Sequence, residues 1–171
     1  MCCAQPAQGP EKRRPGPGRR LLKKSIVCIG SIWITEDMAG LQVYKRLQDT
    51  EHPRTVEVFF GGLSGLNLLP FLEQGGRVVF VDNVKGFAAP GRVVVLDQSQ
   101  VIASRELRHY GHGAGLPFLL TVLPEVCTGT MPREIFLVGI EEKFTSESVQ
   151  EAACLSLQIA ENGRCCHGKE L

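Results

Sequence analysis

The sequence predicts a single α/β domain, with a mixed, mostly parallel five-stranded sheet and helices on both of its faces. Five short runs of apolar, largely β-branched residues alternate with segments of helical spacing, and this alternation is typical of a sheet that is covered on both sides. The link between the third and fourth runs is too short for a crossover helix, so we expect these two strands to run antiparallel. A hydrophobic fraction of 43% over 171 residues is enough for one core.

The expected elements follow in order along the chain. A helix is predicted over 37–47, because apolar residues recur there at three-residue steps, and Glu36 and Asp37 suit its N-terminal turn. The helix expected over 63–72 should be kinked or delayed by Pro70. Further helices are expected over 116–123 and, after a cap at Thr145, over 146–159. The strands are expected at 25–29, 55–60, 77–81, 92–96 and 134–140.

Charge and composition divide the chain into three parts. Residues 1–24 carry seven basic residues and one acidic residue, and with their Pro and Gly content they are predicted to be a disordered basic extension. We expect the folded domain at 25–162 and a frayed tail at 163–171. The formal charge of +1 gives no reason to expect a nucleic-acid partner, and an extended terminus explains the basic segment more simply than a nucleic-acid or lipid arm does.

No apolar stretch approaches the length of a membrane span, so we expect a cytoplasmic monomer without a membrane partner. The seven cysteines include no Cys-x-x-Cys motif, and their odd count argues against a closed disulfide framework.

Three separated residues are candidate metal ligands: Asp37, Asp82 and His112. Two carboxylates and an imidazole suit a borderline metal ion such as nickel or zinc. In open α/β sheets, ligands bind beyond the carboxyl ends of the strands near a topological switch point, which gives the three a reason to converge. Taken singly, Asp37 is equally well a helix-start acid, Asp82 a turn former and His112 a loop residue, with His109 as an alternative ligand.

The sequence lacks the motifs of two common enzyme classes, the dinucleotide-binding enzymes and the serine hydrolases. The first predicted strand is followed by Gly30-Ser31-Ile32 rather than by a Gly-x-Gly-x-x-Gly phosphate loop. No Gly-x-Ser-x-Gly nucleophile elbow is present either.

An ordered series of motifs resembles one family, the endopeptidases that mature nickel–iron hydrogenases. The resemblance covers about 26–160, and its single motifs are weak while their order and spacing are fairly specific. It is carried by the following segments: Gly30-Ser31-Ile32-Trp33-Ile34-Thr35-Glu36-Asp37-Met38-Ala39-Gly40, Phe60-Gly61-Gly62, Val79-Phe80-Val81-Asp82, Pro90-Gly91, Gly111-His112-Gly113-Ala114-Gly115-Leu116 and Leu137-Val138-Gly139-Ile140-Glu141.

The resemblance implies a phosphorylase/hydrolase-like α/β fold and a metal-dependent endopeptidase. The activity it implies is removal of a C-terminal extension from the precursor of the hydrogenase large subunit after nickel insertion. Asp37, Asp82 and His112 would then form the catalytic, nickel-sensing site. Nickel would arrive with the substrate, so no permanent cofactor is implied. We expect direct attack by water, because the sequence presents no Ser or Cys nucleophile paired with a base.

Two positions depart from the family pattern. Ser31 replaces an Asn, a mild change because Ser also hydrogen-bonds turn backbone. Phe60 replaces the acidic residue before Gly61-Gly62, and an aromatic ring accepts no proton. An alternative is therefore a non-catalytic, nickel-dependent binding partner of the immature large subunit, and a third hypothesis is another metal-dependent hydrolase. Glu36 is expected to cap the helix or to support the metal ligands without binding the metal itself. Trp33 either faces a partner or lies partly buried over the sheet.

Overall fold

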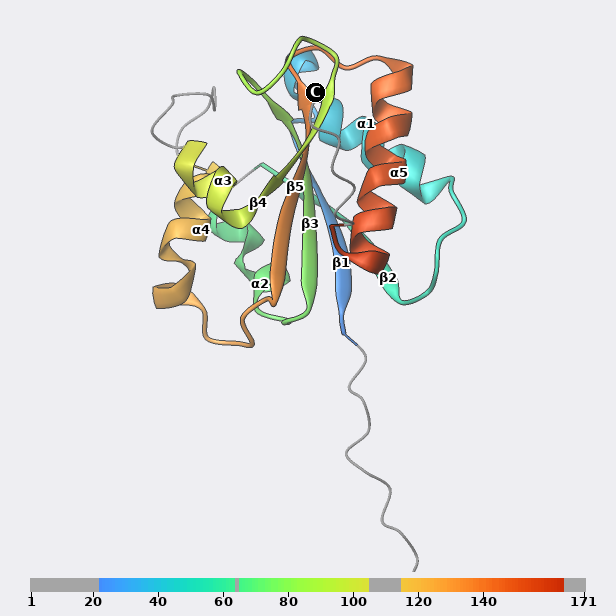
Figure 1. Cartoon of the computed structure of the whole chain (residues 1–171). Coiled ribbons are helices and arrows are strands. Elements are labelled where there is room, and N and C mark those ends of the chain that lie inside the picture. Colours follow the sequence, from blue (N-terminus) through green and yellow to red (C-terminus); the bar gives the residue numbers. More distant parts are fainter. Residues whose placement is uncertain (1–21, 64, 105–114, 165–171) are drawn as a thin grey trace, which may run out of the picture.

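The computed structural model describes residues 22–63, 65–104 and 115–164. Within these ranges, five strands form one sheet in the order β2-β1-β3-β5-β4 (Figure 1). The pairs β1–β2, β1–β3 and β3–β5 are parallel, whereas β4 pairs with β5 antiparallel. The predicted mixed, mostly parallel sheet is confirmed. Its strands are β1 (Lys24–Ile29), β2 (Val56–Gly62), β3 (Arg77–Val84), β4 (Val93–Asp97) and β5 (Glu134–Glu141).

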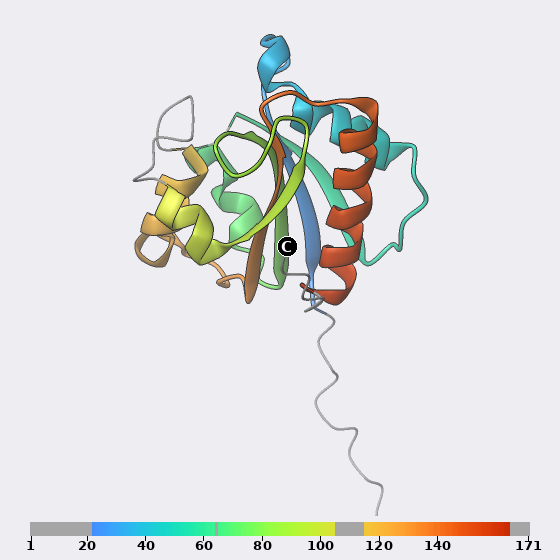
Figure 2. The ribbon, with the colours of Figure 1, turned by 45° about the horizontal axis from the view of Figure 1, so that its top comes forward.

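Helices cover both faces of the sheet, as predicted. Figures 1 and 2 show α1 and α5 on one face and α2, α3 and α4 on the other. The described helices are α1 (Ala39–Gln48), α2 (Leu69–Leu72), α3 (Gln98–Ala103), α4 (Gly115–Val126) and α5 (Ser146–Asn162), together with the 3₁₀ turns η1 (Thr35–Asp37) and η2 (Leu66–Leu68). None of the described helices has the length and apolar character that a bilayer crossing requires.

Side-chain alternation along β3 separates two apolar clusters. Val79 and Val81 belong to the cluster under α1 and α5, whereas Val78 and Phe80 belong to the cluster that includes residues of α2, α3 and α4. These four side chains are fully buried, as expected for a central parallel strand that is covered on both faces. Strand β3 is therefore the axis of the core.

The short link after β3 has the predicted effect on strand direction. No helix interrupts the chain between β3 and β4, so β4 runs opposite to the parallel strands. Its hydrogen-bonded partner is β5, which lies between β3 and β4 in the sheet. Strand β4 therefore forms an antiparallel edge on an otherwise parallel sheet.

Two helical segments differ from expectation. The helix expected over 63–72 is reduced to η2 and the single turn of α2, because Pro70 is favourable only in a first turn and Gly65 has a φ of +151°. Helix α3 was not expected. Asp97 accepts a hydrogen bond from the Gln100 backbone, and the Gln100 side chain accepts one from Asp97 N–H, which is the capping box that marks a helix start.

Other expectations are met within a few residues. Helix α1 begins at Ala39 rather than residue 37. Helix α5 opens on the predicted Thr145 cap, where Thr145 and Ser148 exchange capping hydrogen bonds. The basic extension and the tail stay predictions, because residues 1–21 and 165–171 lie outside the described ranges.

A buried carboxylate holds the connection between β3 and β4. Glu141, at the end of β5, is 1% exposed. Its carboxylate accepts hydrogen bonds from three successive backbone N–H groups, those of Gly86, Phe87 and Ala88. Charge-assisted bonds of this kind are stronger than neutral ones, and they offset the cost of burying the acid. The loop after β3 is thus fixed from the neighbouring strand.

We expect Glu141→Gln to lower the free energy of unfolding by about 1.5–3 kcal/mol. The Gln side chain carries no charge, and its NH₂ group would face backbone N–H groups that need an acceptor. Urea unfolding measures the change. The control is Glu142→Gln, since Glu142 lies 3.9 Å from Lys85 Nζ in a pair of partly exposed side chains, where the change should stay within about 0.5 kcal/mol. Equal effects of the two substitutions would contradict the role assigned to Glu141.

Candidate functional site

The topology creates a switch point between β1 and β3. After β1 the chain passes through α1 to β2 on one side of β1, and it then returns to β3 on the other side. The segments that follow β1 and β2 therefore leave the same carboxyl edge, and η1 projects beyond this edge at the top of Figure 2. This is the place where open α/β sheets bind ligands.

The backbone around Asp37 folds tightly against the end of β1. Gly30 has a φ of +154°, and a Cβ there would lie 2.4 Å from the carbonyl oxygen of Asp37. That same carbonyl accepts a hydrogen bond of 3.0 Å from Ser31 N–H. Glycine is therefore required at position 30, and the close approach returns the chain to the sheet edge at Asp37.

Ser31 performs the turn-forming role predicted for it. Its side chain is 5% exposed, and Oγ accepts hydrogen bonds from the backbone N–H groups of Trp33 (3.0 Å) and Ile34 (3.1 Å). This is the local turn chemistry that Asn and Ser share. The change from the family's Asn is therefore accommodated within the loop.

Asp82 lies inside β3 rather than at its end, because β3 continues to Val84 in register with β5. The interpretation of Asp82 as a turn former is wrong. Its side chain is directed, by strand alternation, to the face that Phe80 and Val84 share with α4. Asp82 is 6% exposed, and Oδ1 accepts a hydrogen bond of 2.8 Å from Asn83 N–H.

The two predicted carboxylates interact electrostatically. Burial raises the pKa of Asp82 well above its usual value, the negative charge of Asp37 raises it further, and the hydrogen bond from Asn83 opposes both effects. Desolvation and like charge act in the same direction here, as they do at many functional sites. The fold therefore places Asp37 within electrostatic range of Asp82 at the β1–β3 switch point.

The third predicted ligand cannot be placed. His112 and the alternative His109 lie outside the described residues, although α4, which follows them, packs on the same face of the sheet as Asp82. Within the described ranges, no group of three His, Cys, Asp or Glu side chains is placed to hold a metal ion. Glu36 is exposed. The ligand set of Asp37, Asp82 and His112 remains a prediction.

Phe60 occupies a packing position. Its ring belongs to the cluster under α1 and lies 5.7 Å from the ring of Tyr44, centroid to centroid. Strand alternation directs Phe60 to the α1 face and Asp82 to the α4 face. The aromatic residue therefore contributes to the core on the opposite side of the sheet.

Sequence reasoning missed Asn83, which supports the site directly. Besides the bond from its N–H to Asp82, Asn83 Nδ2 donates to the carbonyl oxygen of Glu142 at 2.7 Å. The signal was a second polar residue after a buried apolar run. Cys28, on the neighbouring strand, is not a nucleophile, because burial and then the charge of Asp82 raise the pKa of its thiol.

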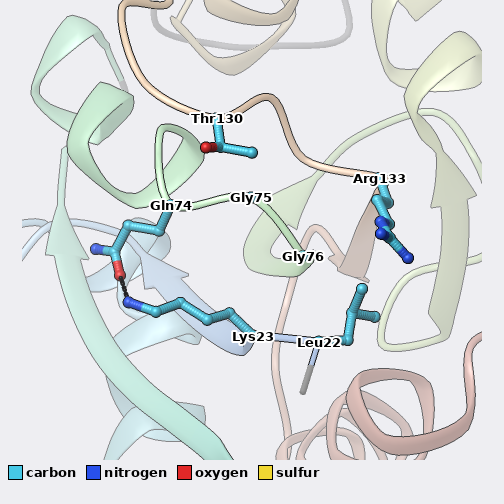
Figure 3. Close-up of a pocket in the computed structure, with 7 residues that line it drawn as sticks. All are labelled: Leu22, Lys23, Gln74, Gly75, Gly76, Thr130 and Arg133. Carbon is cyan, nitrogen blue, oxygen red and sulfur yellow. Dashed lines mark hydrogen bonds between the residues drawn. The ribbon is translucent and has the colours of Figure 1, made fainter. Parts of the chain in front are cut away.

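A cavity of about 130 Å³ lies at the other end of the sheet. Figure 3 shows it between the start of β1, the turn before β3 and the segment before β5, with Lys23 Nζ donating to Gln74 Oε1 at 2.8 Å. It contains none of the predicted site residues. Its lining residues are Leu22, Lys23, Gln74, Gly75, Gly76, Thr130 and Arg133.

Comparison with known families identifies the chain. Residues 41–161 match the family model HycI, described as hydrogenase maturation protease. The chain belongs to the hydrogenase maturation protease family. The matched segment includes Phe60 and Asp82, whereas Asp37 precedes it.

Individual relatives agree with this assignment. Over 79 residues the chain is 30% identical to the hydrogenase expression/formation protein HupD of Rhodobacter capsulatus, a match that covers 46% of this chain and only 38% of HupD. The fold is similar to that of the hydrogenase maturating endopeptidase HybD from E. coli, with a TM-score of 0.63, 24% identity and coverage of 81% of this chain and 93% of that chain. HybD from Thermococcus kodakarensis, a [NiFe] hydrogenase maturation protease, gives a TM-score of 0.59 at 21% identity, over 80% and 97% of the two chains.

Replacement of Asp82 by Asn should stabilise the metal-free protein by about 1–2 kcal/mol at pH 7, because burial and the charge of Asp37 oppose the ionisation of Asp82 in the folded state alone, and Asn does not ionise. Folded Asp82 has a raised pKa, so the wild type loses stability relative to Asp82→Asn as the pH rises from about 4, the ordinary carboxyl range, through the raised value. Urea unfolding between pH 4 and pH 8 measures the difference.

The matched control is Asp97→Asn. Hydrogen bonds from Ser99 and Gln100 lower the pKa of Asp97, so its carboxylate stabilises the fold above the ordinary carboxyl pKa, and its replacement should give no gain at pH 7. A loss of stability in Asp82→Asn would show that the Asp82 charge is compensated in the native protein.

Proposed function

We propose that this member of the family is an endopeptidase that removes a C-terminal extension from a nickel–iron hydrogenase large-subunit precursor after nickel insertion. The observation that carries the proposal is the coupling of Asp37 to the buried Asp82 at the switch point. Family membership supplies the class of reaction, and the protein partner is inferred from it.

Two adjacent carboxylates favour a cationic ligand. Each ionised oxygen is a hard donor, and the unfavourable charge of the pair is relieved when a divalent cation binds between them. Nickel accepts oxygen and imidazole ligands with high affinity in the divalent series. We propose that Asp37 and Asp82 ligate the nickel of the substrate, with His112 as the third ligand. A precursor without nickel would then bind less tightly at these carboxylates.

The same carboxylates can serve the cleavage step. A substrate-borne nickel ion would position the scissile peptide and polarise its carbonyl. Water would attack the carbonyl carbon while one of the carboxylates accepts its proton, and the same carboxyl group would give that proton to the leaving nitrogen as the C–N bond breaks. Among the described cysteines, Cys28 is buried with a raised thiol pKa, which favours water over a thiolate nucleophile.

Phe60 supports a second candidate function. If catalysis in this family needs the acidic residue that Phe60 replaces, the chain would bind the nickel-loaded precursor and hold it without cleavage. Water attack assisted by Asp37 or Asp82 does not require a carboxylate on the α1 face, where Phe60 packs. This arrangement favours the endopeptidase.

The primary test incubates the purified protein with the large-subunit precursor of the same organism, nickel-loaded or nickel-free, and reads intact mass. We expect a C-terminal peptide to be lost from the loaded precursor alone, and the rate to fall at least about 100-fold in Asp82→Asn. Asp97→Asn is the matched control and should cleave normally. Nickel-dependent complex formation without any loss of mass would favour the binding partner, and neither binding nor cleavage would reject both.

We expect Phe60→Asp to lower the free energy of unfolding by about 2–4 kcal/mol, because it removes a ring packed on Tyr44 and places a charge in its position. Its cleavage rate should not exceed that of the wild type, since position 60 faces away from Asp82. Phe60→Leu keeps an apolar side chain and controls for packing. A large rise in cleavage in Phe60→Asp alone would instead identify the natural protein as a weakened protease.

A further inference from the structure

Exposed apolar side chains gather at one edge of the described sheet. Of the seven large apolar residues that are exposed in the described ranges, five lie on the two segments that follow β1 and β2: Ile32, Trp33, Ile34, Leu63 and Leu66. Trp33 is 87% exposed, Leu63 63% and Leu66 59%, so the partial burial considered for Trp33 is wrong. Clustering of this kind, in contrast to single scattered residues, marks interaction sites.

Both segments are held in place by polar side chains. Ser31 Oγ fixes the turn at Trp33 and Ile34, while Asn67 Nδ2 donates to the carbonyl oxygens of Gly61 (3.0 Å) and Leu63 (2.9 Å). A hydrogen bond of 2.8 Å from Gly30 N–H to the carbonyl of Gly62 joins the two segments at their roots. The apolar residues are thus presented outward by ordered turns, which lowers the entropy cost of binding.

We propose that these five residues, which we call the apolar rim, are the docking surface for an apolar segment of the precursor polypeptide, next to the peptide bond that is cleaved. This inference rests on the proposed function and extends it to a specific surface. The rim leaves the ends of β1 and β2, and β3 with Asp82 lies on the other side of β1. A bound chain that crosses these strand ends therefore reaches both the rim and the carboxylates.

Charge distinguishes the precursor from a second copy of this chain as the occupant. The rim segment after β1 also carries Glu36, which is exposed. A symmetric contact between two copies would bring the Glu36 side chains of both copies close to each other, and like charges at a contact oppose association. A partner that brings a divalent cation together with an apolar segment complements both parts of this edge.

The test compares Trp33→Ser and Leu66→Ser with Met131→Ser. Met131 is 41% exposed and follows Thr130, which lines the cavity at the opposite end of the sheet (Figure 3). We expect Trp33→Ser to weaken binding of the nickel-loaded precursor at least about tenfold, as for an interface anchor, and Met131→Ser to change it less than about twofold. Unchanged urea midpoints would confirm that the exposed substitutions leave the fold intact.

A direct readout comes from Trp33, the one tryptophan of the chain. Labelled as 5-fluorotryptophan, it should give a fluorine resonance that shifts when the precursor binds and loses its accessibility to an added paramagnetic agent. Cleavage by Trp33→Ser should show a raised KM with kcat close to that of the wild type, because a docking contact that is made equally in the ground state and the transition state contributes to binding alone.

The outcomes separate this inference from the proposed function. Binding and cleavage by all three variants at wild-type values would overturn the docking surface and leave the endopeptidase standing. A wild type that neither binds nor cleaves the precursor would overturn both. A concentration-dependent dimer that Trp33→Ser dissociates would assign the rim to a second copy and overturn the precursor as its occupant.

Discussion

The burial of β3 on both faces is the constraint on which the candidate site depends. Because α1 and α5 cover one face and the α2–α4 side covers the other, the side chain of Asp82 on this strand is withdrawn from water. Asp82 is placed there beside the charge of Asp37, and both effects raise its pKa. An exposed aspartate at the same edge would be fully solvated, with no unfavourable charge for a cation to relieve.

Much of the fold follows from local pattern. The apolar runs predicted all five strands, and the short link after β3 predicted the antiparallel β4, since both depend on nearby residues. The end of β3 differs from the expected one because Asn83 and Val84 are held in the sheet by pairing with Ile140 and Glu141 of β5, which are distant in sequence. The helix over 63–72 was overestimated because Pro70 limits it from within. Helix α3 has a local signal in Asp97 and Gln100, which form its capping box.

For the candidate site, the sequence supplies candidate residues but not their geometry. Motif order and the switch-point rule both indicate that Asp37 and Asp82 converge, and the tight approach of Gly30 to the Asp37 carbonyl explains why that motif needs its glycine. Sequence could not tell which face each side chain takes, since this depends on register. The replacement at Phe60 therefore looked like a loss of catalytic chemistry, whereas its ring lies on Tyr44 across the sheet from Asp82.

The apolar rim and the carboxylates of Asp37 and Asp82 suggest different contributions to recognition of the precursor. The apolar rim stands on ordered turns and is available before any partner arrives, so its contribution to binding is the same for a loaded or an empty precursor. The charge of Asp37 raises the pKa of the buried Asp82, and a partner that brings a cation would favour the ionised form of both carboxylates. Under the proposed function, discrimination between the two forms would therefore come from Asp37 and Asp82, whereas overall affinity would come from the rim. An endopeptidase that acts only after metal insertion would need this separation, since strong apolar docking alone would retain the empty precursor.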